Sequence, residues 1–211
     1  MTLEKGKVKN LLYHERKANK RGFRHIAGID EAGRGPLAGP VVAASIILRQ
    51  VRFKHRIDDS KKLTARARLL AYGEILEKAW IGVGIVSEKI IDRINIYNAT
   101  VLAMEKAVNN LGIKPDFLLV DGRIKLKTAC GRSHIIKGDS KSLSIACASI
   151  IAKVTRDEIM REYHKKYPRY GFSRHKGYAT REHVRRLMKH GPSPIHRASF
   201  NPVKKMIQEV T

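Results

Sequence analysis

The sequence predicts an α/β fold in which helices flank a mixed sheet, followed by a helical C-terminal part. Short runs of β-branched residues bounded by Gly and Pro are typical of buried strands. Helix-forming stretches with apolar residues at helical spacing lie between most of these runs. The first two strands are joined by a turn too short for a crossover and should be antiparallel, which makes the sheet mixed.

The elements follow in order along the chain. The segment up to Arg24 carries eight Lys/Arg and two Glu, so it is either a short docked helix or a mobile arm. Clustered β-branched residues predict strands at 26–29, 41–48, 80–86 and 117–120. Helical spacing predicts helices at 64–79, 100–111, 142 to about 167, and 180–190, with Ser87 as a further N-cap.

The length of 211 residues fits one large domain. We expect a basic N-terminal segment at 1–25, one globular domain at 26–203 including its C-terminal helices, and a tail at 204–211. The two cysteines, Cys130 and Cys147, are too few for a disulfide framework and are expected to be reduced.

The charge points to a polyanionic partner. There are 43 Lys and Arg against 19 Asp and Glu, a net charge of +24, which favours nucleic acid over a generic basic or membrane-adsorbing surface. The apolar run at 36–48 is too short for a membrane span, and the first 25 residues, with Glu4 and Glu15 and no serine, do not resemble a transit peptide. We therefore expect a cytoplasmic monomer without a membrane partner.

Carboxylates follow two of the predicted strands directly. Asp30 and Glu31 come after 26–29, and Asp121 comes after 117–120. Strand ends of α/β sheets are common ligand sites, so these side chains are expected to converge around a hard cation such as Mg²⁺. The absence of a Cys/His ligand pattern disfavours zinc. The alternative is structural: Asp30 caps a turn and Asp121 begins one with Gly122.

Two loops are candidates for substrate contacts. Backbone N–H groups at Gly33-Arg34-Gly35 can approach a phosphate or ribose closely, although these glycines also suit a plain turn. Tyr178, in the basic stretch 175–178, can stack on a sugar or base, with a core or interfacial tyrosine as the alternative. The cysteines and histidines show no nucleophile signature.

Residues 59–63 (DSKKL) are similar in sequence to residues 139–143 (DSKSL). In both segments Asp or Ser can cap a helix whose N-terminus attracts phosphate. On the residues alone, Asp59 and Asp139 rank equally as further candidate site residues.

The motifs together resemble the ribonuclease HII family across residues 26–203. The matching strings are GIDEAGRGPLAGPVV (28–42), DSKKL (59–63), VDG (120–122), KGDS (137–140), SIA (144–146), ASIIAKVTRD (148–157), HKGY (175–178) and PIHR (194–197). Cys147 departs from the alanine that is usual in the family, but a reduced cysteine suits a small apolar position.

The resemblance implies a ribonuclease H-like catalytic domain. Its four catalytic and metal-binding carboxylates map onto Asp30, Glu31, Asp121 and Asp139, the last on the family pattern alone. Its elements that read the ribonucleotide 2′-hydroxyl map onto Gly33, Arg34, Gly35 and Tyr178, and Lys61 is expected to be a further substrate-binding residue. The related ribonuclease HIII usually carries Lys in place of Arg34.

The implied activity is endonucleolytic hydrolysis of the RNA strand of RNA–DNA hybrids, with cuts 5′ of single ribonucleotides in duplex DNA. We expect 3′-hydroxyl and 5′-phosphate products and two Mn²⁺ or Mg²⁺ ions about 4 Å apart. The implied role is removal of misincorporated ribonucleotides and RNA primers. One alternative is a basic nucleic-acid-binding protein without catalysis, and another is a DNA-cutting integrase or resolvase of the same fold class.

Overall fold

A five-stranded mixed sheet forms the centre of the computed structural model, which describes residues 11–209. In spatial order the strands are β3 (Ala79–Val86), β2 (Val41–Leu48), β1 (Ile26–Ala32), β4 (Phe117–Asp121) and β5 (Gly131–Ile135). The pairs β1–β2 and β2–β3 are antiparallel, whereas β1–β4 and β4–β5 are parallel. The predicted fold class and the antiparallel leading pair are confirmed.

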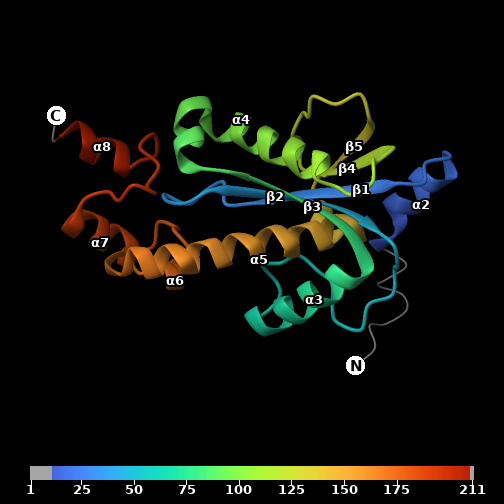
Figure 1. Cartoon of the computed structure of the whole chain (residues 1–211), viewed down its shortest axis with the longest axis horizontal. Helices are drawn as coiled ribbons and strands as arrows, with labels where there is room; N and C mark the ends of the chain where they lie inside the picture. The colour runs from blue at the N-terminus through green and yellow to red at the C-terminus, as the bar shows by residue number, and fades with distance from the viewer. Residues whose placement is uncertain (1–10, 210–211) are drawn as a thin grey trace.

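Helices cover both faces of this sheet. They are α2 (Tyr13–Lys20), α3 (Ala65–Lys78), α4 (Glu88–Asn109), α5 (Leu143–Lys166), α6 (Phe172–His175), α7 (Arg181–His190) and α8 (Val203–Gln208), with 3-10 turns η1 (Gly138–Ser140) and η2 (Pro168–Tyr170). Helix α4 packs on one face and α5 with α3 on the other, while α7 and α8 lie at the opposite end of the molecule from α2 (Figure 1). Within residues 11–209, every helix is too short or too polar to cross a lipid bilayer.

Side-chain caps explain where several helices begin. Thr64 accepts a hydrogen bond from the Ala67 amide at 3.2 Å, and Ser142 accepts one from the Ile145 amide at 3.3 Å. Ser87 occupies the N-cap position of α4, but its side chain makes no capping bond. The residues of α4 form two helical segments that meet at a kink at Asn95, which has a φ of 64° and accepts a hydrogen bond from the Asn98 amide at 3.0 Å. The first segment follows Ser87, and the second contains most of the helix predicted at 100–111.

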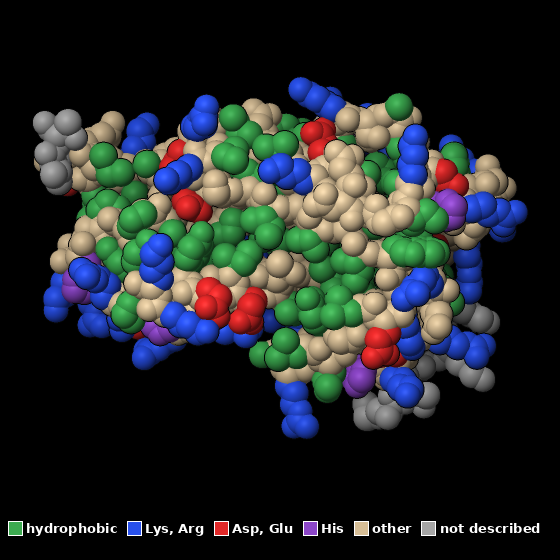
Figure 2. Space-filling view, in the orientation of Figure 1, with side chains coloured by type: hydrophobic (Ala, Val, Ile, Leu, Met, Phe, Trp, Pro, Cys, Tyr) green, Lys and Arg blue, Asp and Glu red, His purple; other side chains and the backbone are tan. Residues whose placement is uncertain are grey.

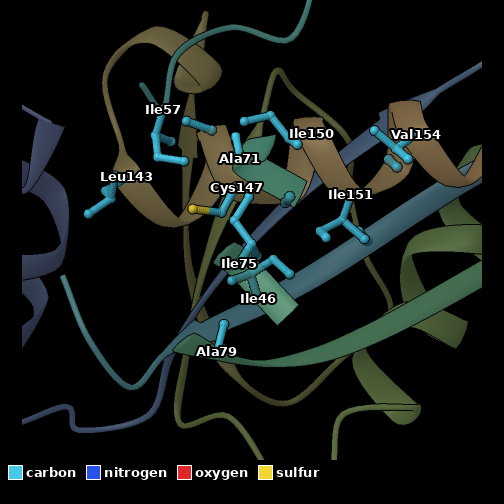
Figure 3. Close-up of a cluster of buried hydrophobic side chains, with 14 of the residues drawn as sticks. Ile46, Ile57, Ala71, Ile75, Ala79, Leu143, Cys147, Ile150, Ile151 and Val154 are labelled. Atoms are coloured by element: carbon cyan, nitrogen blue, oxygen red, sulfur yellow. The ribbon is translucent and has the colours of Figure 1, made fainter. Parts of the chain in front are cut away.

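Glycines let the two longest helices approach the sheet. A Cβ at Gly28 of β1 would lie 2.3 Å from the Ser144 carbonyl carbon of α5, and one at Gly84 of β3 would lie 1.9 Å from the Ala103 oxygen of α4. Figure 3 shows the apolar cluster between α5, α3 and the sheet, which includes Cys147. Cys130 and Cys147 are both free, as predicted.

Strand β5 departs from the prediction, and helix α2 decides between the two alternatives for the N-terminal segment. Strand β5 was not predicted, because its sequence GRSHI is polar and it lies at the edge of the sheet. Helix α2 is docked: buried Glu15 accepts hydrogen bonds from the Ser142 hydroxyl at 2.6 Å, the Ser144 hydroxyl at 2.8 Å and the Ser144 amide at 3.0 Å. The docked-helix alternative therefore holds for residues 13–20, and residues 1–10 lie outside the described part. Helix α8 spans most of the predicted tail.

Candidate active site

Asp30 and Asp121 lie at the same level on the adjacent parallel strands β1 and β4, just past the last paired residues. The register of β1 and β4 ends with Ile29 opposite Val120, one residue before each carboxylate. Alternate residues of a strand point to the same face, so Asp30 shares the α5 face with Gly28, and Asp121 shares it with Leu119. The sheet thus brings together two carboxylates that are far apart in the sequence.

Asp139 joins them from turn η1. The Gly138 amide donates to Asp121 Oδ1 at 2.6 Å, which ties the turn to the end of β4. Asp139 is buried, and it interacts with both Asp121 and Asp59. The two short sequences that resemble each other, 59–63 and 139–143, therefore meet at this site.

Glu31 lies beside this cluster on the other face of β1, since neighbouring residues of a strand point in opposite directions. Its Oε1 is 3.4 Å from Nη1 of Arg34, whose side chain is 44% exposed. Arg34, predicted to contact phosphate, is thus paired with a carboxylate here while remaining accessible.

Burial and mutual repulsion disfavour the ionised carboxylates. Burial raises the pKa of Asp30 well above its usual value, and the charges of Glu31 and Asp121 raise it further. Burial also raises the pKa of Glu31, which attraction by Arg34 only partly offsets. For Asp139, burial and then the charges of Asp59 and Asp121 raise the pKa. A bound cation would relieve this repulsion.

Lys61 and two serines support the cluster. Partial burial lowers the pKa of Lys61, but attraction by Asp59, Asp139, Asp30 and Asp121 outweighs it and leaves the pKa raised. Ser60 Oγ lies 2.9 Å from Ser149 Oγ, and a hydrogen bond from Ser149 helps to stabilise the charged form of Asp30. The loop that carries Lys61 is thereby attached to α5.

The donor set fits a hard divalent cation, because every candidate ligand is a carboxylate oxygen. Among residues 11–209, however, no three His, Cys, Asp or Glu side chains already surround a single point closely enough to hold a metal ion. Such a site needs additional oxygens from water and from a substrate phosphate, which is usual for Mg²⁺.

The predicted recognition residues lie next to one another. Residues 33–40, which we call the glycine loop, contact residues 176–179, which we call the Tyr178 loop. The Leu37 amide donates to the Gly177 oxygen at 2.8 Å. Tyr178 is 42% exposed, so it is not a core tyrosine. A Cβ at Gly35 would meet no atom within 4 Å, which leaves this side of the loop open to a ligand.

Sequence reasoning ranked Asp59 as a candidate equal to Asp139, and it assigned no role to three further residues around the site: Ser149, Arg156 and Arg197. The similarity between 59–63 and 139–143 was the signal for Asp59. The other three residues lie within the strings 148–157 and 194–197 that carry the family resemblance, but those strings do not indicate what the side chains contact. A cavity of about 680 Å³ lies elsewhere, lined by the end of α4 and by residues 111–116 and 128–131, and it contains none of the predicted site residues.

Comparison with known proteins agrees with this geometry. The family model described as Ribonuclease HII matches residues 27–203. Ribonuclease HII of Acetivibrio thermocellus is 56% identical over 188 residues, covering 89% of this chain and 73% of that protein. Ribonuclease HII of Bacillus licheniformis is 55% identical over 191 residues, covering 90% and 74%.

A solved structure shares the fold. The crystal structure of ribonuclease H2 from Pyrococcus horikoshii OT3 superposes with a TM-score of 0.75 at 26% identity, covering 88% of this chain and 98% of that one. The chain is therefore a ribonuclease H-type hydrolase and belongs to the ribonuclease HII family.

Proposed function

We propose that this protein is a metal-dependent endonuclease that cuts the RNA strand of RNA–DNA hybrids and cuts 5′ of single ribonucleotides in duplex DNA. Its products would carry 3′-hydroxyl and 5′-phosphate ends. The observation that carries the proposal is the adjacency of Asp30 and Asp121 at the ends of paired strands, with Asp139 bonded into the same site beside the open glycine loop. The cellular role we propose is removal of misincorporated ribonucleotides and RNA primers.

Asp30, Glu31, Asp121 and Asp139 would hold two Mn²⁺ or Mg²⁺ ions together with the substrate phosphate. When bound, such ions lower the pKa of an attacking water and neutralise charge on the leaving oxygen. The chain's own contribution is to hold mutually repelling carboxylates in place: the Gly138 amide fixes Asp121, and Ser149 fixes Asp30. That arrangement gives the free protein a strong preference for cations at this site.

Substrate selection would come from the neighbouring loops. Backbone groups of Gly33, Arg34 and Gly35, which follow Glu31 in the chain, and the exposed ring of Tyr178 would contact the ribose 2′-hydroxyl, which distinguishes RNA from DNA. Lys61 adds a positive charge next to the acidic cluster. Lys and Arg side chains spread over the surface in Figure 2 are suited to contacts with phosphates along a duplex.

The test is cleavage of an end-labelled DNA duplex with one embedded ribonucleotide, in Mg²⁺, Mn²⁺ or EDTA, beside an all-DNA duplex. We expect one metal-dependent cut on the 5′ side of the ribonucleotide and no cut in the control. Binding without cutting in either metal would favour the non-catalytic alternative, and cutting of the all-DNA duplex would favour the integrase or resolvase class.

A further inference from the structure

Two arginines are buried completely beside the candidate site. Arg156 on α5 and Arg197 before α8 each have 0% exposure. Within the part of the chain that the structure describes, neither forms an ion pair with a carboxylate. Burying a charge is costly unless something compensates it, so these positions need an explanation other than surface charge.

Backbone carbonyl groups supply the compensation, and nearly all of them belong to the glycine loop. Arg197 donates to the oxygens of Gly33 at 2.6 Å, Arg34 at 2.9 Å and Gly39 at 2.8 and 3.0 Å. Arg156 donates to the oxygens of Pro40 at 2.9 Å, Ala38 at 3.1 Å and Lys176 at 3.0 Å. The last bond also attaches the Tyr178 loop.

These bonds determine which way the loop faces. The C=O and N–H of a planar trans peptide point in opposite directions. Because the carbonyls of Gly33 and Arg34 point inward to Arg197, the N–H groups of Arg34 and Gly35 point outward. Among residues 11–209 these two N–H groups have no acceptor. A Cβ at Gly33 would collide with Arg156 Nε at 2.1 Å, whereas one at Gly35 would meet open space.

We propose that Arg156 and Arg197 are positioning residues for substrate recognition. They hold the glycine loop with its carbonyls inward, so that the N–H groups of Arg34 and Gly35 form a preformed donor pair for an oxygen of the nucleic-acid backbone. The two guanidinium charges behind the loop add positive potential to this face. The proposal rests on the proposed function and adds to it the residues that set the shape of the recognition loop.

Substitution of an arginine by lysine separates the effect of its positive charge from the effect of its hydrogen bonds to the glycine loop. Arg197→Lys keeps the charge, but a single ammonium cannot reproduce the planar fork that bonds three carbonyls. Arg156→Lys tests the other end of the loop if the first variant folds poorly. Ile75→Ala is the matched control, because Ile75 is fully buried on α3 and its apolar cluster contains no residue of the glycine loop. Gly35→Ala adds a methyl to the open side without touching either arginine.

The first readout needs no substrate. In protein labelled with ¹⁵N-glycine, we expect the amide signals of Gly33, Gly35 and Gly39 to shift in Arg197→Lys and to stay in place in Ile75→Ala. The second readout is a pair of dissociation constants, one for an all-DNA duplex and one for a duplex with one ribonucleotide. Both are measured in EDTA, at a temperature that is the same number of degrees below Tm for every variant. We expect the affinity for the ribonucleotide duplex to fall about tenfold in Arg197→Lys and Gly35→Ala, equivalent to about one hydrogen bond, and to be unchanged in Ile75→Ala.

The outcomes are distinct. If only the ribonucleotide duplex loses affinity, the donor pair binds the 2′-hydroxyl, and if both duplexes lose affinity equally, it binds a phosphate oxygen; both support the proposal. Unchanged glycine signals in both lysine variants, or unchanged affinity for both duplexes, would overturn it. Wild-type protein that neither cuts nor prefers the ribonucleotide would refute the proposed function instead, while the amide shifts would still decide whether the arginines hold the loop.

Discussion

His183 and His196 are joined by one proton between Nε2 atoms 3.0 Å apart. The Ser193 amide donates to His196 Nδ1 at 2.9 Å, so a neutral His196 carries its proton on Nε2 and donates it to His183. His183 then carries its own proton on Nδ1 and donates to the Tyr178 oxygen at 2.8 Å. This chain requires both rings to be neutral, and it connects the segment before Arg197 to the Tyr178 loop.

Acid should therefore loosen this region. Burial lowers the pKa of His183 to about 4 and of His196 to about 3, against 6.5 for an ordinary histidine. Below pH 6.5 the unfolded chain binds more protons than the folded one, so the stabilisation is complete above 6.5 and is lost as the pH falls toward 4 and 3. Urea unfolding from pH 7.5 to 5 should show this loss.

A variant isolates the contribution of one ring. Near pH 5, His196→Gln should reduce the slope of unfolding free energy against pH by about 1.4 kcal/mol per pH unit. His190→Gln, at the exposed end of α7, the helix that carries His183, is the control and should retain the wild-type slope. Equal slopes in His196→Gln and wild type would contradict the neutral-pair interpretation.

Asp30→Asn should separate catalysis from stability. Cleavage should fall by about a thousandfold or more, while duplex binding in EDTA persists because phosphate contacts dominate affinity. In metal-free buffer at pH 7.5, loss of a buried charge repelled by Glu31 and Asp121 should raise stability by about 1 kcal/mol, or about 2–4 °C in Tm.

The matched control is Asp157→Asn on α5. Asp157 is also buried, but it lies 2.6 Å from the Lys153 ammonium and 3.8 Å from Arg68, so its removal should lower Tm. Near-normal cleavage by Asp30→Asn would refute its catalytic assignment, and a lower Tm would refute the repulsion argument.

Tyr178→Phe tests the exposed hydroxyl beside the glycine loop. Loss of one hydrogen bond should reduce cleavage at a single embedded ribonucleotide by about tenfold without changing Tm. Tyr13→Phe, on the exposed side of α2, serves as the control. If the two variants cut equally well, the Tyr178 hydroxyl has no part in recognition.

Glu15→Ala should detach α2 from the start of α5. The carboxylate accepts three hydrogen bonds from Ser142 and Ser144 in a buried position, so its loss should cost about 2–4 kcal/mol in unfolding free energy. Glu158→Ala, whose side chain is 54% exposed, should change stability by less than about 0.5 kcal/mol. Comparable losses in both variants would contradict a specific docking role.

The sequence predicted what depends on local patterns. Apolar runs predicted β1 to β4 and most helices, and carboxylates directly after strands indicated Asp30, Glu31 and Asp121. What it did not predict depends on tertiary contacts. Edge strand β5 has a polar sequence, and the two helical segments of α4 meet at Asn95, whose positive φ the sequence did not indicate. Arg156 and Arg197 look like two of many surface cations until the fold places carbonyl groups around them.

Helix α5 supports both parts of the candidate site. Ser149 steadies Asp30, and Arg156, about two helical turns or about 10 Å further along, holds the glycine loop. A continuous helix cannot lengthen or shorten between these residues. Under the proposed function, the distance between the phosphodiester bond that is cut and the sugar whose 2′-hydroxyl is recognised is set by the fixed length of α5 between Ser149 and Arg156. The cleavage position should then be the same whatever bases surround the ribonucleotide.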